Sequence, residues 1–107
     1  MSLTHLAFVL AKPDCTGPLA ARIAELAVEA AGEPGCIEFT IHQSSDDPAL
    51  WFLYSSWQSA EALAEHLEHG SGRHFAEASG GLLEESMDVH SFIRRRPLRA
   101  DTLAIAA

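Results

Sequence analysis

Residues 33–75 read EPGCIEFTIHQSSDDPALWFLYSSWQSAEALAEHLEHGSGRHF, and this stretch decides the fold. It opens with Glu33-Pro34-Gly35, which predicts a turn, because proline fixes its own φ and glycine accepts angles closed to other residues. Two apolar runs follow, each with the alternation of period two that a strand requires. Their alternating residues are Ile37, Phe39 and Ile41 in the first run, and Leu50, Phe52 and Tyr54 in the second. The polar connection at 44–48 contains turn-forming residues, so the two runs predict a β-hairpin.

The segment before the hairpin predicts one strand and one helix. Residues 3–11 alternate, and both resulting faces are largely apolar, as in a strand that is covered on both sides. Thr16 or Gly17 is placed to cap a helix. From residue 19 the apolar side chains recur at helical spacing until Gly32, where this helix should end.

The segment after the hairpin predicts helical pieces and a last strand. Ser59 is a suitable helix cap, and the helix should reach about Glu68. Two glycines within residues 70–72 should interrupt it, so a second helical piece is expected over residues 73–79. Residues 84–94 alternate again and predict the final strand.

The element order β-α-β-β-α-β is the split βαβ pattern of ferredoxin-like α+β folds, with a four-stranded antiparallel sheet. Helices cover only one face of such a sheet, yet the predicted strands are apolar on both faces and need a second cover. A chain of 107 residues also buries little surface on its own. We therefore expect a homodimer joined through the sheets. The domain should span residues 1–96, followed by a C-terminal tail at 97–107.

Charge and hydropathy argue against nucleic acid and membrane as partners. The formal net charge is −8, and residues 1–93 carry 14 acidic against 3 basic side chains, a net charge of −11. A body of this charge repels nucleic acid. No apolar run approaches the roughly 20 residues that span a bilayer. The remaining basic residues, Arg94, Arg95, Arg96 and Arg99, most simply form a solvated end of the last strand.

The start of the chain and its two cysteines bear on the compartment. Met-Ser-Leu-Thr-His lacks the basic region and the apolar segment of a secretory signal, so we expect a cytoplasmic protein. Cys15 precedes the predicted helix, and Cys36 opens a predicted strand. In a reducing compartment both should be free thiols.

Several short motifs follow one another in a defined order along the central stretch. They are Gly35-Cys36 before a strand, His42 near its end, Asp46-Asp47-Pro48 in the turn, Leu53-Tyr54 and Trp57 in the next strand, Ser59 to Leu63 at a helix start, His66-Leu67 and His74-Phe75. In this order they resemble the antibiotic biosynthesis monooxygenase (ABM) domain family. The resemblance covers the central stretch closely and the remainder by element order. It departs at Ser55, where the family often has Glu, and in a longer link at 68–73.

The resemblance implies a dimeric α+β barrel, in which two sheets meet, and an activity. Members of the family oxidise hydroquinone or anthrone-type phenols with molecular oxygen and need no metal, flavin or haem, because the electron-rich substrate anion itself reduces oxygen. The implied function is a cofactor-independent monooxygenase acting on a small phenolic substrate.

Two alternatives stay open at this point. One is an enzyme that isomerises or enolises a small ketone with the same base, and the other is a non-catalytic dimeric ligand-binding domain. Haem degradation is disfavoured, since haem-degrading relatives depend on an asparagine in the first strand and this chain contains no asparagine.

Histidines are the candidate catalytic residues, and the chain has six. His66 and His69 lie three apart on a predicted helix, but no further ligand stands at a recognised spacing, so we expect no metal site. His66 lies at the border of the apolar stripe beside Leu67, where it can project between helix and sheet and act as a base near neutral pH. It matches the family's helix histidine, and His74 is the second candidate, as a hydrogen-bond donor, a role that Tyr54 could also fill. The alternative for His66 is a structural histidine at the helix edge.

Aromatic side chains and one arginine are the candidate substrate-binding residues. Trp57, Tyr54, Phe75 and Phe39 can line a pocket for a flat ring, with Trp57 and Phe75 favoured because they flank the helix that carries the candidate base. The alternative is that these rings belong to the core, which is the common role of aromatic residues at alternating strand positions. Arg73 is available for an anionic group of the substrate.

Overall fold

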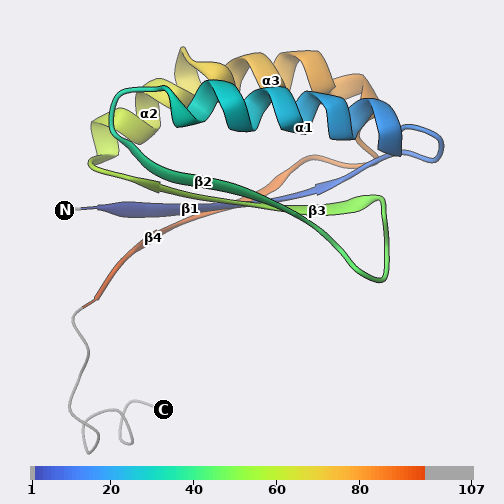
Figure 1. Ribbon diagram of the computed structural model, residues 1–107, viewed down its shortest axis with the longest axis horizontal. Coiled ribbons are helices and arrows are strands. Elements are labelled where there is room, and N and C mark those ends of the chain that lie inside the picture. Colours follow the sequence, from blue (N-terminus) through green and yellow to red (C-terminus); the bar gives the residue numbers. More distant parts are fainter. Residues whose placement is uncertain (1, 96–107) are drawn as a thin grey trace, which may run out of the picture.

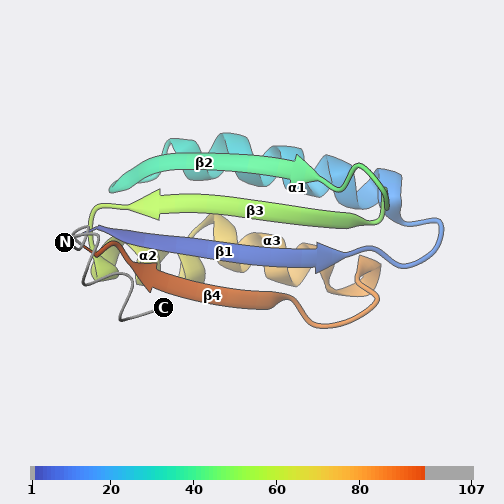
Figure 2. The same cartoon turned by 90° about the horizontal axis from the view of Figure 1, so that it is seen from below.

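The fold is a four-stranded antiparallel sheet with its helices packed on one face (Figure 1). The structure is a computed structural model, and it describes residues 2–95. The elements in chain order are β1 (Leu3–Leu10), α1 (Thr16–Ala31), β2 (Cys36–Gln43), β3 (Leu50–Trp57), α2 (Ala60–Glu68), α3 (Ser71–Ser79), a 3-10 turn (Gly80–Leu82) and β4 (Asp88–Ile93). The order across the sheet is β2-β3-β1-β4 (Figure 2). This arrangement confirms the predicted ferredoxin-like α+β fold, while the expected boundary after residue 96 and the tail beyond it lie outside the described residues.

Alternation along the strands divides the side chains between the core and the opposite face of the sheet. On β1, His5, Ala7 and Val9 are buried beneath the helices, whereas Phe8 between them is 39% exposed. The apolar stripe predicted for α1 is buried, and its members are Leu19, Ile23, Leu26 and Ala30. The core therefore lies between the sheet and the helices.

Two helices begin earlier than the sequence predicts. α1 begins at Thr16, so Cys15 takes the capping position, where its side chain makes no capping hydrogen bond. α3 begins at Ser71 rather than Arg73, because the Ser71 amide donates to the carboxylate of Glu33 at 2.9 Å and so gains the partner that a first-turn amide lacks. Within residues 2–95 no helix has the length and the apolar character needed to cross a membrane.

Two strands are less regular than predicted. The register of β2 shifts between Cys36 and Glu38, and this irregularity leaves Ile37 54% exposed instead of alternating with Phe39 and Ile41. β4 starts at Asp88 rather than at residue 84, because the chain leaves the sheet ladder after an isolated bridge between Leu83 and Ala11.

The sheet face without helices is aromatic, and within the described residues nothing covers it. Phe8 stacks on Phe52 with ring centroids 5.1 Å apart, and His42 stacks on Phe52 at 5.5 Å. The pairing register places Tyr54 and Phe92 on the same face, and Phe92 is 50% exposed. An apolar face of this kind is typical of a protein interface.

We expect the chain to be an obligate homodimer joined through this face. Sedimentation at low micromolar concentration should give about twice the chain mass of 11.5 kDa. Phe8→Glu places a charge at the stacked rings and should dissociate the dimer, whereas Val28→Glu, at a position 77% exposed on α1, should leave it intact. A folded wild-type monomer at all concentrations would contradict this expectation.

We also expect Cys15 and Cys36 to stay free thiols. Both are free in the structure, and burial, together with the nearby charge of Glu33, raises the pKa of the Cys36 thiol and keeps it unreactive. Thiol titration of denatured protein prepared without reductant should therefore find two thiols. A chain of unchanged monomer mass with no free thiol would show that the two are bridged.

Candidate active site

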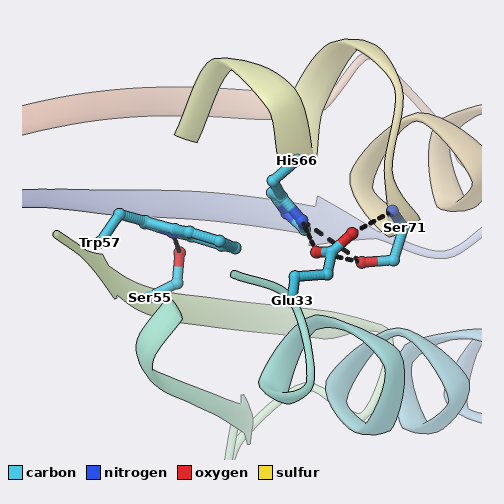
Figure 3. A network of polar contacts seen from close by, with 5 residues as sticks. All are labelled: Glu33, Ser55, Trp57, His66 and Ser71. Carbon is cyan, nitrogen blue, oxygen red and sulfur yellow. Dashed lines mark hydrogen bonds and ion pairs between the residues drawn. The ribbon is translucent and has the colours of Figure 1, made fainter. Parts of the chain in front are cut away.

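A polar cluster joins Glu33 to His66 and Ser71, which lie in a distant part of the chain (Figure 3). Nδ1 of His66 lies 2.6 Å from Oε1 of Glu33. The other carboxylate oxygen, Oε2, accepts the backbone amide of Ser71 at 2.9 Å, and Ser71 Oγ donates to Oε1 at 2.8 Å. The His66 side chain is 4% exposed and that of Glu33 is 21% exposed. The buried imidazole is thus hydrogen-bonded to a carboxylate, and Ser71, the first residue of α3, donates hydrogen bonds to the same carboxylate.

Glycines allow the segments of this cluster to approach one another. Gly35 has a φ of 83°, in the left-handed region, and a Cβ there would clash with the side chain of Ala62 in α2. The turn that carries Glu33 can therefore lie against α2. A Cβ at Gly70 would clash with Oε2 of Glu33, and a Cβ at Gly72 would lie 2.8 Å from Nε2 of His66. The glycines that the sequence marks as a helix interruption make room for the carboxylate and the imidazole.

The hydrogen bonds of the cluster decide the charge of Glu33 and the tautomer of His66. Partial burial alone would raise the pKa of Glu33, but the Ser71 amide, the His66 ring and the Ser71 hydroxyl donate to it, and together they lower that pKa. Glu33 is therefore ionised near neutral pH and can only accept hydrogen bonds. It follows that neutral His66 carries its proton on Nδ1 and its lone pair on Nε2.

His66 forms part of the wall of a small cavity between the helices and the sheet. The cavity has a volume of about 50 Å³. Its apolar lining includes Ala7, Leu26, Phe39, Leu53, Phe75 and Met87. Nε2 of His66 lies beside Gly72, which also lines the cavity. The free lone pair therefore faces an apolar space, while the exposed fractions of Leu67 and Val89, 41% and 50%, place these two residues at its mouth.

Trp57 packs against His66 and does not line the cavity. The indole is fully buried and packs against the imidazole with ring centroids 4.5 Å apart and the two planes tilted by 32°. Its Nε1 donates to Ser55 Oγ at 2.9 Å, which fixes the orientation of the indole (Figure 3). Ser55, the position at which the sequence departs from the family pattern, thus helps to place the ring against which His66 rests.

The sequence profile described as antibiotic biosynthesis monooxygenase (ABM) matches residues 2–79. The chain belongs to the ABM family. The match spans every element from β1 to α3, and it confirms the resemblance that the central motifs indicate.

Solved structures share the ABM fold of this chain. Rv0793 from Mycobacterium tuberculosis is 20% identical with a TM-score of 0.83, over 92% of this chain and 100% of that one. SO0527 from Shewanella oneidensis is 26% identical with a TM-score of 0.77, over 85% and 88% of the two chains. A protein described as an antibiotic biosynthesis monooxygenase is 17% identical with a TM-score of 0.81, over 88% and 99%. No curated protein matches the chain.

The structure brings part of the expected ABM site together. Phe39 and Phe75 line the cavity with His66, and the ring of Phe39 meets the imidazole edge-on at a centroid distance of 6.0 Å. Trp57 contacts His66 but lies behind it, so it does not form the cavity wall that the sequence suggests.

Three other expected site residues lie away from the cavity. Tyr54 points to the helix-free face, because its neighbours Leu53 and Ser55 on β3 are the ones buried beneath the helices. Arg73 is exposed and pairs with Glu77 across one helical turn at 2.7 Å. His74 is exposed as well, since α3 buries only the residues at four-residue spacing, which are Ser71, Phe75 and Ser79.

His69 also points away from the candidate site. Its side chain is 63% exposed, and its Nδ1 lies 3.3 Å from Oε2 of Glu65. It therefore does not lie at the cavity with His66. Among residues 2–95 no group of three His, Cys, Asp or Glu side chains is placed to hold a metal ion.

Three residues of the site are missed by sequence reasoning. The sequence pattern places Glu33 only in a turn and Ser71 only in a helix interruption. His5 is buried on β1 and lines the cavity from the sheet. A signal for His5 does exist, because it shares the period-two face of Ala7 and Val9, which are buried in the core.

Proposed function

We propose that this ABM-family chain is a monooxygenase that oxidises a small quinol, anthrone or similar phenol with molecular oxygen and without a cofactor. The observation that carries the proposal is the imidazole of His66, fixed through Nδ1 by Glu33 and facing an apolar cavity with Nε2. A carboxylate–imidazole pair at an apolar cavity is an arrangement that suits a general base, because the carboxylate orients the ring and stabilises its protonated form. The name of one neighbour in fold, an antibiotic biosynthesis monooxygenase, supports the same reaction class.

The proposed reaction begins with a proton transfer to His66. Nε2 removes a proton from the phenol, and Glu33 stabilises the imidazolium that forms. The substrate anion gives one electron to dioxygen, and the resulting radical pair combines to form a carbon–oxygen bond. His66 returns its proton to the outer oxygen. Loss of water then breaks the O–O bond and removes the last hydrogen from that carbon, so one oxygen atom stays in the product as a carbonyl.

The size of the cavity limits how the substrate binds. About 50 Å³ holds dioxygen or a few water molecules, since one water needs roughly 10–15 Å³ on this measure. A benzene ring needs about three times this cavity's volume. Ring binding therefore requires lining side chains to move, and Leu67 at the mouth and the flexible Met87 further in are suited to this movement.

Oxygen uptake with a panel of quinols and anthrones tests the proposal. We expect uptake above the rate of autoxidation, one dioxygen for each substrate molecule, and one atom from ¹⁸O₂ in the product. Added catalase should return no oxygen, because the second atom leaves as water rather than as peroxide. Uptake that never exceeds autoxidation across the panel would refute the proposal.

The same material distinguishes the two alternatives. Deuterium exchange into small ketones under argon, without oxygen uptake in air, would favour an enolising enzyme that uses the same base. A phosphorylated ketone is the less favoured substrate, since Arg73 is exposed and already paired with Glu77. A chain that binds quinols but is silent in both assays would be a ligand-binding domain.

A further inference from the structure

His5 is a second buried histidine, and it lacks a hydrogen-bonding partner. It lies on β1, is 7% exposed, and its ring makes none of the side-chain hydrogen bonds found within residues 2–95. Within the described residues, the fully buried side-chain atoms that lack a partner are Trp51 Nε1 and Ser79 Oγ, so the ring nitrogens of His5 keep accessible surface and can still take a partner. This surface borders the cavity, because His5 is part of the cavity lining.

The cavity has few polar side chains, and they lie on two different walls. His5 and Ser55 face it from the sheet, where they are register partners on β1 and β3, and His66 faces it from α2. Ser55 Oγ already accepts the indole N–H of Trp57. Two imidazoles, one on each wall, are therefore the groups best placed to meet polar atoms of a bound molecule.

The environment of His5 favours its uncharged form. Burial lowers its pKa first, and the neighbouring His66 lowers it further. A neutral imidazole offers one donor and one acceptor, so it suits an uncharged hydroxyl or carbonyl oxygen rather than an anion.

We propose that His5 is a second substrate-contacting residue, which hydrogen-bonds one oxygen of the substrate while His66 meets another. The inference rests on the proposed function and narrows its substrate class. Imidazoles on two different walls can each hydrogen-bond one oxygen of an aromatic ring that carries two oxygen functions, such as a hydroquinone. A ring with one oxygen function can occupy only one of them. His5 then fixes the end of the ring that does not react and orients the other end toward Nε2 of His66.

Binding without oxygen tests this inference separately from the reaction. Under argon, the wild-type protein should bind hydroquinone about 3- to 10-fold more tightly than phenol, the ratio that one additional hydrogen bond typically gives. His5→Leu should remove this preference and leave phenol binding unchanged. His5→Gln, which keeps a donor and an acceptor, should restore part of it. His69→Leu, at an exposed position on α2, is the matched control and should keep the full preference.

A second measurement keeps the test decisive if His5→Leu does not fold. In the wild-type protein, the ¹⁵N signals of both the His5 and the His66 rings should shift when hydroquinone binds, whereas phenol should shift those of only one ring. The inference is overturned if hydroquinone does not shift the ¹⁵N signals of His5, or if folded His5→Leu retains the preference for hydroquinone. It is also overturned if the wild-type protein binds neither hydroquinone nor phenol. Absence of oxygen uptake by a protein that shows the preference would instead count against the proposed reaction alone.

Discussion

His66→Ala is expected to lower turnover by about 10²- to 10⁴-fold on a substrate that the wild-type protein oxidises, the range that a positioned general base contributes. The reason is geometric. His66 is the imidazole that a carboxylate holds at 2.6 Å and whose other nitrogen borders the cavity. Initial rates of oxygen uptake at saturating substrate measure the effect.

His69→Ala is the matched control on the same helix. Its side chain is 63% exposed and contacts only a surface carboxylate, so turnover should change little. Because removal of a buried histidine also costs stability, urea unfolding and the oligomeric state must be measured for both variants. If His66→Ala remains a folded dimer with full activity, the assignment of the base is wrong.

The period of two along the strands predicts the sheet, and it also limits which strand residues can share one site. Tyr54 and Trp57 are three residues apart on one strand, so their side chains must point to opposite faces. They cannot both contact the same cavity, and the structure places Trp57 on the helix side. Which of two apolar faces meets the helices cannot be decided from one strand whose faces are both apolar.

The cluster around His66 could not be predicted because it depends on contacts between distant residues. Glu33 lies 33 positions from His66 and 38 from Ser71 in the chain. The three meet because the turn after α1 packs its Gly35 against Ala62 of α2 and so places Glu33 beside Gly70, at the junction of α2 and α3. Local patterns predicted both segments, but nothing in either one specifies the distance between them. His66 can be predicted from the sequence because its position on a helix stripe is a local property.

Glu33→Gln is expected to lower turnover by roughly 10- to 10³-fold. The variant keeps His66, the proposed base, but changes the tautomer of its ring. The Ser71 amide needs an acceptor, so the glutamine oxygen should take the place of Oε2, and its NH₂ group should take the place of Oε1 beside Nδ1 of His66. That NH₂ group donates, so Nδ1 must accept and the ring proton moves to Nε2. Nε2 then carries a proton and no longer offers a lone pair to the cavity. Replacing the carboxylate of a Ser-His-Asp triad by an amide lowers turnover for the same reason, because it gives the wrong histidine tautomer.

Ser71→Ala separates this tautomer effect from a general loosening of the cluster. It removes the hydroxyl that donates to Oε1 but keeps the backbone amide and the carboxylate. Turnover should fall by less than about tenfold, the value of one ordinary hydrogen bond. The ¹⁵N shifts of His66 should report a proton on Nδ1 in the wild-type protein and in Ser71→Ala, and on Nε2 in Glu33→Gln. An unchanged tautomer in Glu33→Gln would contradict the mechanism even if activity fell.

Glu33→Gln should also change how stability depends on pH. The pKa of Glu33 is lowered in the folded state from an ordinary value of 4.5, so its charge stabilises the fold above that pH, and the contribution is lost as the pH falls through the lowered value. The glutamine variant lacks this contribution, while all other carboxyl groups are common to both proteins and cancel in the comparison. The wild-type protein should therefore exceed the variant in free energy of unfolding by urea near neutral pH, and the difference should shrink in acid below about pH 4.5. A difference that stays constant down to the acid limit would mean that the ionised carboxylate of Glu33 does not hold the cluster together.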